Sequence, residues 1–437
     1  MSRLEPNRRR AATCALVLAA ALAVAASNAA GAAGDDDDLS DKQVEALAEE
    51  YLALDGRTDA GRQRQLAILA ELDGQPALDA RDAKRWRKTF LELAADGPEL
   101  EKRSGRKWFW EEEERGLYIV GGKTKSPKGL FIGMHGGGVG EGDAANSAAA
   151  FGSAASKFKW VGIFPEVLEK TEHGWTDSGT EEFVVDLIEC VLRTWKVDPD
   201  RVYLGGHSMG GYGTWTLGAH HADSVAGLAP SAGAPTPLLD RGGNQVGVIP
   251  GVIPSLRNVR LAIFQSADDP QVPPEANRFA VEELGKARER FGGFDYEYWE
   301  VEHNAHDLPP GGARELLEKI ADAERDPVPP KVVWQTFLPW KRHFYWLWSE
   351  VPDGEALVVA ELDREANAID VTVDGRLADL SLLLDDRLVD LEREVVVRVG
   401  GEERWRGVPE RTLATLLMTA DRCDPGLVFE ARVRVLP

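Results

Sequence analysis

The chain has few cysteines and far fewer basic than acidic residues, and each shortage excludes a class of function. Of its 437 residues, 51 are Lys or Arg and 73 are Asp or Glu, so the formal net charge is −22. Nucleic-acid binding needs a basic face that neutralises phosphates, so we expect no nucleic-acid partner. The three cysteines and eight histidines show no spacing typical of metal ligands, which predicts that the chain has no metal site. Cys190 and Cys423 are interpreted as isolated thiols, with a disulfide between them as the alternative.

The chain also lacks an apolar run long enough to span a membrane. The apolar stretch over residues 11–26 is shorter than the roughly 20 residues that a span needs. It follows the arginines at 8–10 and precedes the small residues at 30–32, which is the layout of a secretory signal. We predict a signal peptide over residues 1–33, export to the periplasm or the cell exterior, and no stable membrane insertion after cleavage. An uncleaved anchor helix is the alternative.

An acidic linker is predicted at 34–40, and residues 41–115 then have helix-like spacing. Val44, Leu47 and Tyr51 fall at offsets that share one helical face. We predict two to four helices, which form an accessory segment without a catalytic motif.

Residues 116–325 alternate between short apolar runs bounded by Gly or Pro and helix-like segments. The predicted strands are 117–120, 129–133, 160–164, 202–204 and 261–264. This alternation predicts an α/β fold, with a mostly parallel sheet covered by helices on both faces.

The C-terminal part of the chain has a different pattern. A proline-rich linker is predicted at 326–331, and residues 332–437 carry several strand-like runs that predict a small β-rich domain. The aromatic-rich stretch over 334–348 is interpreted as core or domain interface. A carbohydrate-stacking surface is the alternative.

The strongest chemical signal is the Gly-His-Ser-Met-Gly-Gly run at 206–211. It follows an apolar strand and opens a helix-like segment, and its small neighbours let Ser208 stand exposed on a tight turn. Ser208 is therefore the predicted nucleophile. Because an alkyl hydroxyl is a poor nucleophile, a base and an acid that orients this base are expected further along the chain.

Candidates for both groups follow in the expected order. The acid is predicted to be Asp269, in the loop after the strand at 261–264, with Asp268 as the alternative. The base is predicted to be His306, just before a helix-like segment, with His303 as the alternative.

A second glycine-rich loop, over 135–138, follows the strand at 129–133. Glycines let backbone N–H groups approach a developing oxyanion. The predicted donors are the amides of Met209 and Gly137, with Gly138 as an alternative to Gly137. Trp175 lies between core elements and is predicted to line the acyl pocket, with simple packing as the alternative.

Residues 198–215, which include this serine motif, resemble the α/β-hydrolase superfamily. Within it they are similar to polyhydroxybutyrate-depolymerase-like, feruloyl-esterase-like and dienelactone-hydrolase-like serine hydrolases, and to predicted peptidases of the prolyl-oligopeptidase type. The likeness covers roughly residues 116–325. This sequence departs from the common pattern at Gln265, where many relatives have a His-Gly pair, and at Ala305, where glycine is common.

The resemblance implies acyl transfer through Ser208, His306 and Asp269, with a small-molecule or polymer ester as substrate and with no cofactor. A serine peptidase is the second hypothesis. The short helical segment before the catalytic core favours the esterase, because prolyl-oligopeptidase-type enzymes carry a large propeller. The third hypothesis is a binding protein that has the fold without activity; the intact Ser, His and Asp candidates argue against it.

Overall fold

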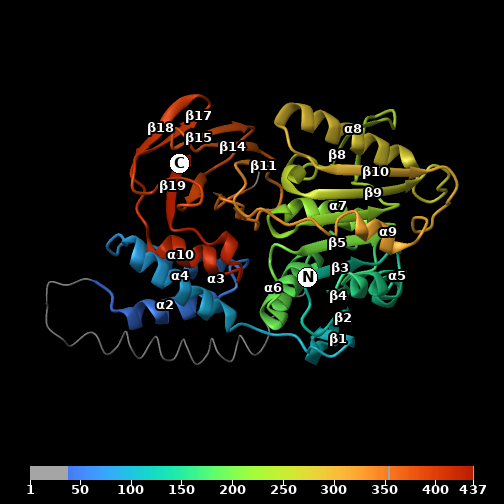
Figure 1. The fold of residues 1–437 in the computed structure, drawn as a ribbon, viewed down its shortest axis with the longest axis horizontal. Coiled ribbons are helices and arrows are strands. Elements are labelled where there is room, and N and C mark those ends of the chain that lie inside the picture. The colour runs from blue at the N-terminus through green and yellow to red at the C-terminus, as the bar shows by residue number, and fades with distance from the viewer. Residues whose placement is uncertain (1–37, 353–354, 437) are drawn as a thin grey trace.

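The computed structural model describes residues 38–352 and 355–436, which form two lobes (Figure 1). The predicted signal peptide at 1–33 lies outside the described residues. One lobe holds an eight-stranded sheet with its flanking helices. The other holds the C-terminal sheets together with the helices of residues 41–95.

The eight-stranded sheet is mostly parallel. Its strands are β1 (Gly105–Trp110), β2 (Arg115–Gly122), β3 (Gly129–Met134), β4 (Trp160–Pro165), β5 (Val202–His207), β6 (Gly227–Ser231), β9 (Arg260–Ser266) and β10 (Tyr296–Val301). They lie in the order β1-β2-β4-β3-β5-β6-β9-β10. β2 is antiparallel to both of its neighbours, and the strands from β4 to β10 are parallel. This order confirms the predicted α/β-hydrolase fold.

Helices cover both faces of this sheet. They are α5 (Ala144–Lys157), α6 (Thr180–Trp195), α7 (Met209–His220), α8 (Pro274–Phe291) and α9 (Ala313–Glu318). Alternate residues of β3 belong to different cores, as the period of two in a strand requires. Phe131 packs in the cluster that contains residues of α5 and α9, whereas Leu130 and Ile132 pack with residues of α6, α7 and α8.

The C-terminal part of the chain forms two further sheets. The five-stranded sheet has the order β11 (Lys331–Gln335), β14 (Leu357–Asp363), β15 (Ala368–Asp374), β17 (Val395–Val399) and β18 (Glu402–Gly407). The four-stranded sheet has the order β12 (His343–Phe344), β13 (Leu347–Trp348), β16 (Leu380–Leu384) and β19 (Ala431–Leu436). In the aromatic-rich stretch, Trp334 and Phe344 are buried and stack with their ring centroids 5.4 Å apart. This stretch therefore packs mainly in the core.

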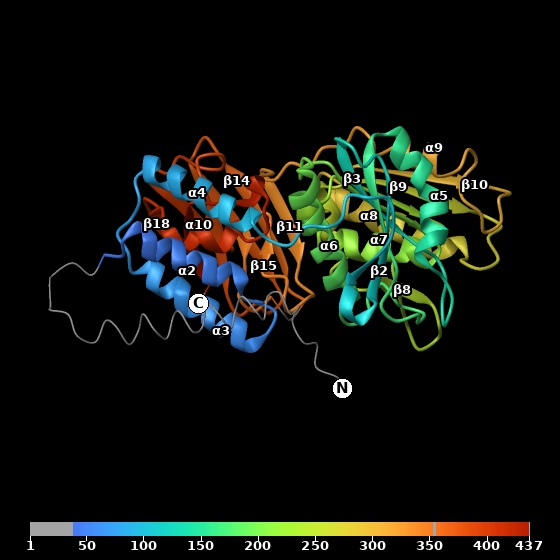
Figure 2. The same cartoon turned by 90° about the horizontal axis from the view of Figure 1, so that it is seen from below.

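The N-terminal helices belong to the same lobe as these sheets. Helices α2 (Asp41–Ala53), α3 (Asp59–Asp73) and α4 (Ala80–Ala95) lie beside α10 (Leu413–Ala420), which α3 and α4 contact directly (Figure 2). A backbone hydrogen bond of 2.9 Å from Leu78 N–H to the Arg411 carbonyl joins the two ends of the chain. This packing places residues 41–95 in one lobe with the C-terminal sheets. The domain boundaries predicted from the sequence remain a prediction.

Buried ion pairs hold the lobes together just beyond the C-terminal end of α7. Asp223 of η3 (Ala222–Ser224) accepts hydrogen bonds from Lys341 at 2.7 Å and from Arg422 at 2.6 Å. The Tyr345 hydroxyl donates to the Ala222 carbonyl at 2.8 Å. Because α7 begins directly after Ser208, the second lobe anchors the far end of the helix that follows the predicted nucleophile.

Two sequence expectations concern features outside the sheets. Cys190 and Cys423 do not form a disulfide, and the Cys423 thiol donates to the Ala94 carbonyl at 2.8 Å. In the described part of the chain, no helix is both long and apolar enough to cross a membrane.

Candidate active site

Ser208 stands on a sharp turn between a strand and a helix. β5 ends at His207 and α7 begins at Met209. Ser208 between them has φ 61° and ψ −123°, a backbone conformation that L residues rarely adopt. This turn presents the Ser208 hydroxyl at the carboxyl end of the sheet, where a parallel α/β fold places its ligands.

Two glycines make this turn sterically possible. A Cβ added at Gly206 would lie 2.4 Å from the Gly210 carbonyl oxygen, and one added at Gly210 would lie 2.2 Å from the Met134 carbonyl oxygen. Both contacts are with backbone atoms, which cannot rotate away. The Gly-x-Ser-x-Gly pattern therefore reflects close approach of three backbone segments: the end of β5, the start of α7 and the end of β3.

The structure brings the three predicted catalytic residues together. His306 Nε2 lies 2.9 Å from Ser208 Oγ, and His306 Nδ1 lies 2.7 Å from Asp269 Oδ2. The Asp269 side chain is fully buried, and its Oδ1 accepts hydrogen bonds of 2.9 Å from the N–H groups of Gln271 and Val272. Asp269 is thus fixed by the turn it belongs to, with one oxygen directed at the imidazole.

The alternative residues occupy different positions. Asp268 Oδ1 accepts hydrogen bonds from Ser266 Oγ at 2.6 Å and from the N–H groups of Asn304 at 3.1 Å and Ala305 at 2.9 Å. These bonds hold the pKa of the Asp268 carboxyl well below its usual range. The His303 side chain is 86% exposed and faces Asp268, not Ser208. Asp268 therefore contacts the loop that carries His306 and does not contact its ring.

The loop that carries His306 is held on both sides of that residue. Ala305 has φ 47°, in the left-handed region that favours glycine. On the C-terminal side of His306, the carbonyls of Asp307 and Leu308 accept hydrogen bonds of 3.1 Å and 2.9 Å from the Asn304 side-chain amide. Sequence reasoning missed the role of Asn304, for which its adjacency to the predicted histidines was the only signal.

His207, the residue before the nucleophile, provides a third support. Its Nε2 lies 3.2 Å from the His306 carbonyl oxygen, so Nε2 carries the proton and donates it there. Its Nδ1 then accepts from the Ser231 hydroxyl at 3.0 Å. Burial, and then the neighbouring His306, lower the pKa of His207, which favours a neutral ring.

The predicted oxyanion donors lie close to Ser208. Met209 is the first residue of α7, so no helical carbonyl can accept its N–H. Gly136 and Gly137 line the same cavity as Ser208, whereas Gly138 does not. Gly137 has φ 143°, and a Cβ there would lie 2.5 Å from the Glu141 carbonyl oxygen, so only glycine fits.

Two buried aromatic rings brace this glycine loop from behind. His135 Nδ1 donates to the Gly136 carbonyl at 2.8 Å, while its Nε2 accepts from the Val167 N–H at 3.2 Å. Burial lowers the pKa of His135, in keeping with a neutral ring. The structure places Trp175 fully in the core, with its indole N–H donating to the His135 carbonyl at 3.1 Å. Trp175 thus does not line the cavity as predicted, and it contacts the loop that does.

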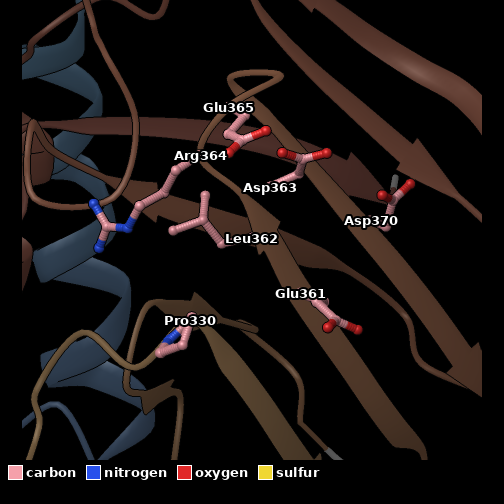
Figure 3. A pocket seen from close by; sticks show the side chains of 7 residues that line it. All are labelled: Pro330, Glu361, Leu362, Asp363, Arg364, Glu365 and Asp370. Atoms are coloured by element: carbon pink, nitrogen blue, oxygen red, sulfur yellow. The ribbon is translucent and has the colours of Figure 1, made fainter.

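The cavity at Ser208 has a volume of about 560 Å³. Its walls come mainly from the glycine loop and from the loop after β10. The lining residues are Gly136, Gly137, Glu141, His207, Ser208, Gln271, His306, Asp307, Leu308, Pro309 and Gly312. A second cavity, of about 500 Å³, lies in the other lobe between Pro330 and the turn from β14 to β15 (Figure 3). It contains none of the predicted site residues.

Solved structures with an α/β-hydrolase fold are similar to this chain at low identity over about half its length. A thermostable esterase is 20% identical over 48% of this chain and 60% of its own, with a TM-score of 0.36. A ferulic acid esterase from Anaeromyces mucronatus, in complex with ferulic acid, is 16% identical over 51% of this chain and 89% of its own, with a TM-score of 0.35. Esterase 2 from Thermogutta terrifontis is 17% identical over 50% of this chain and 91% of its own, with a TM-score of 0.36. This chain therefore spans less than two thirds of the length of the first.

Neither protein-family models nor curated protein sequences match this chain. The fold assignment accordingly rests on the strand order and strand directions of the chain itself.

Proposed function

We propose that this chain is an exported carboxylic-ester hydrolase that forms an acyl-enzyme on Ser208. The observation that carries the proposal is the continuous hydrogen-bonded series from Ser208 Oγ to His306 at 2.9 Å and on to Asp269 at 2.7 Å. A nucleophile, a base and an acid that orients the base are the parts that acyl transfer needs. Their position at one wall of an open cavity gives a substrate access to the hydroxyl.

In the proposed acylation step, Ser208 Oγ bonds to the ester carbonyl carbon while His306 Nε2 takes the hydroxyl proton. Asp269 holds the opposite ring nitrogen and stabilises the imidazolium that forms. Collapse of the tetrahedral intermediate breaks the bond to the alcohol oxygen, which receives the proton from His306. Water then adds to the acyl carbon while the same imidazole takes its proton. Collapse of this second tetrahedral intermediate releases the acid and returns the proton to Ser208 Oγ.

The negative charge of each tetrahedral intermediate would be accepted by the N–H groups of Met209 and Gly137. Each such donor typically contributes about 3 kcal/mol to transition-state stabilisation. The buried supports of the glycine loop, His135 and Trp175, would hold the Gly137 N–H in place before the substrate arrives. Preorganised donors of this kind avoid the cost of reorienting dipoles during the reaction.

The proposal is tested by turnover of p-nitrophenyl acetate and butyrate, beside peptide p-nitroanilides for the peptidase hypothesis. We expect ester hydrolysis that Ser208→Ala abolishes and no comparable release of p-nitroaniline. Hydrolysis of peptides but not of esters would replace the esterase proposal with the peptidase. Folded protein with neither activity would favour a binding protein.

Export is the second part of the proposal and rests on the arginines, apolar stretch and small residues of the first 33 positions. In a Gram-negative host we expect the mature chain in the periplasm, starting at residue 34, as read by mass spectrometry of its N-terminal peptide. A Leu18→Arg variant interrupts the apolar stretch and should remain full-length in the cytoplasm. Full-length wild-type protein in the membrane fraction would support an anchor helix instead.

A further inference from the structure

Two acidic residues that the proposed chemistry does not use line the cavity at Ser208. Glu141 lies on the glycine loop, and Asp307 directly follows His306, so each of the two loops that contact Ser208 contributes one. Both residues are exposed. None of the residues that line this cavity is Lys or Arg.

The lysine that contacts the glycine loop through its backbone has its ammonium paired elsewhere. Lys170 is the basic residue joined to the glycine loop, since its carbonyl accepts from the Gly140 N–H at 2.8 Å. Its ammonium instead pairs with Glu166 at 3.1 Å. Burial, and then the neighbouring His306, lower the pKa of His207, which disfavours a positive charge on its ring.

We propose that Glu141 and Asp307 make this site selective for the charge of its substrate: esters with a cationic or neutral group beside the scissile bond are preferred over anionic ones. The inference deepens the proposed esterase function and rests on it. A negative group held in the cavity would lie beside two acidic residues of a lining that contains no Lys or Arg. Unit charges several Å apart near a protein surface interact by about 1 kcal/mol, which changes a rate constant about three- to tenfold.

The carboxylates also face the developing oxyanion, but that effect is common to every ester. It cancels in a ratio of kcat/KM values for substrates that react through the same intermediate. The ratio between a cationic and an anionic ester therefore isolates the selectivity from the chemistry. The released acid is itself an anion, so the same two charges should also favour its departure.

The test uses three p-nitrophenyl esters of similar length: butyrate, 4-(trimethylammonio)butyrate and the monoester of glutaric acid. For wild type at low salt we expect kcat/KM for the cationic ester to exceed that for the anionic ester by about 100-fold or more, because each carboxylate favours the cation and disfavours the anion by about three- to tenfold. In Glu141→Gln/Asp307→Asn the ratio should fall close to 1. In 0.5 M NaCl the wild-type ratio should also fall, because salt screens exposed charges.

The second, acidic cavity provides a matched control. Asp363 and Glu365 lie at its rim in the other lobe (Figure 3), so Asp363→Asn/Glu365→Gln changes the net charge equally but far from Ser208. This variant should keep the wild-type ratio, which separates a local field from the effect of overall charge. A ratio that falls equally in both double variants would overturn the role of Glu141 and Asp307.

The outcomes distinguish failure of this inference from failure of the esterase proposal. If no ester, including the neutral butyrate, is hydrolysed, the esterase proposal fails. If butyrate is hydrolysed by a Ser208-dependent reaction but the wild-type ratio is near 1, only the charge selectivity is overturned.

Discussion

The Asp268 carboxylate accepts a hydrogen bond of 2.9 Å from the backbone N–H of Ala305, the residue before His306. The neighbouring carboxylate, Asp269, contacts the His306 ring at 2.7 Å. Two successive acidic residues thus act on one histidine through different contacts. Asp268 fixes the backbone of its loop, and Asp269 orients its imidazole.

This division predicts different responses to the same substitution. Asp269→Asn should lower kcat by on the order of 10⁴, because an amide can stabilise the wrong tautomer of His306 and carries no charge to balance the imidazolium. Asp268→Asn should stay within about tenfold of wild type, since its amide oxygen still accepts from the N–H groups of Asn304 and Ala305. Steady-state kinetics on p-nitrophenyl butyrate measures both.

Asp268→Ala completes the series as the variant that removes the acceptor. A histidine displaced by part of an ångström can lose about 10- to 100-fold in kcat, while KM changes little. If Asp268→Asn keeps its activity and Asp268→Ala loses it, Asp268 is a positioning residue. If Asp268→Asn were the more damaging variant and Asp269→Asn were active, the assignment of the two carboxylates would be reversed.

A second prediction concerns the backbone at Ala305. Its φ of 47° costs an alanine roughly 1–2 kcal/mol, which a glycine avoids at some entropic cost. Ala305→Gly should therefore raise the free energy of unfolding slightly, by about 0.5 kcal/mol, with activity retained. Ala305→Val should lower both the free energy of unfolding and the activity, because β-branched residues are the least tolerant of positive φ. Urea denaturation, with ester turnover alongside, provides the comparison, and a Val variant as stable as wild type would be inconsistent with this strain.

A third prediction is loss of stability in mild acid. Burial lowers the pKa of His221 to about 4 and that of His343 to about 3. Because the unfolded histidines bind protons first, their stabilising contribution is complete above pH 6.5 and is lost as the pH falls toward 4. Asp421 opposes this: burial raises its pKa to about 6, so its contribution is complete below pH 3.8 and is lost as the pH rises through 6.

Burial also lowers the pKa of His135 and His207 and raises that of Asp200. Four such histidines against two carboxyls give a net loss as the pH falls from 6.5 to 4, on the order of 1.4 kcal/mol per pH unit for each uncompensated group. Urea unfolding at several pH values measures this slope. His343→Gln should flatten it, whereas His303→Gln, at a side chain that is 86% exposed, should not. A free energy of unfolding that is constant over this range would contradict the burial of neutral histidines in the lobe interface.

Local sequence features predicted the turn at Ser208, because its strand, its glycines and its helix are contiguous and sterically linked. Glycine at 206 and 210 is required by contacts within that same turn and with β3. The choice between Asp268 and Asp269 could not be made this way. It depends on which carboxylate captures the N–H groups of Gln271 and Val272, a detail of turn geometry that adjacent identical residues do not reveal.

Features that depend on distant partners were also beyond sequence reasoning. Trp175 is buried because it packs on Gly213 of α7, where a Cβ would lie 2.6 Å from the indole. An aromatic residue alone does not distinguish a pocket wall from a core. Similarly, the apolar face around Val44 and Tyr51 predicted that the first helix is packed, but not that its lobe is built with the C-terminal sheets.

The most direct test of the central claim is labelling of the mature protein with a fluorophosphonate, followed by identification of the labelled peptide by mass spectrometry. We expect one label on Ser208 and a loss of ester turnover in step with labelling. The Ser208→Ala variant should show neither label nor turnover. A folded wild-type protein that hydrolyses esters but takes no label at Ser208, or a Ser208→Ala variant that remains active, would contradict this claim.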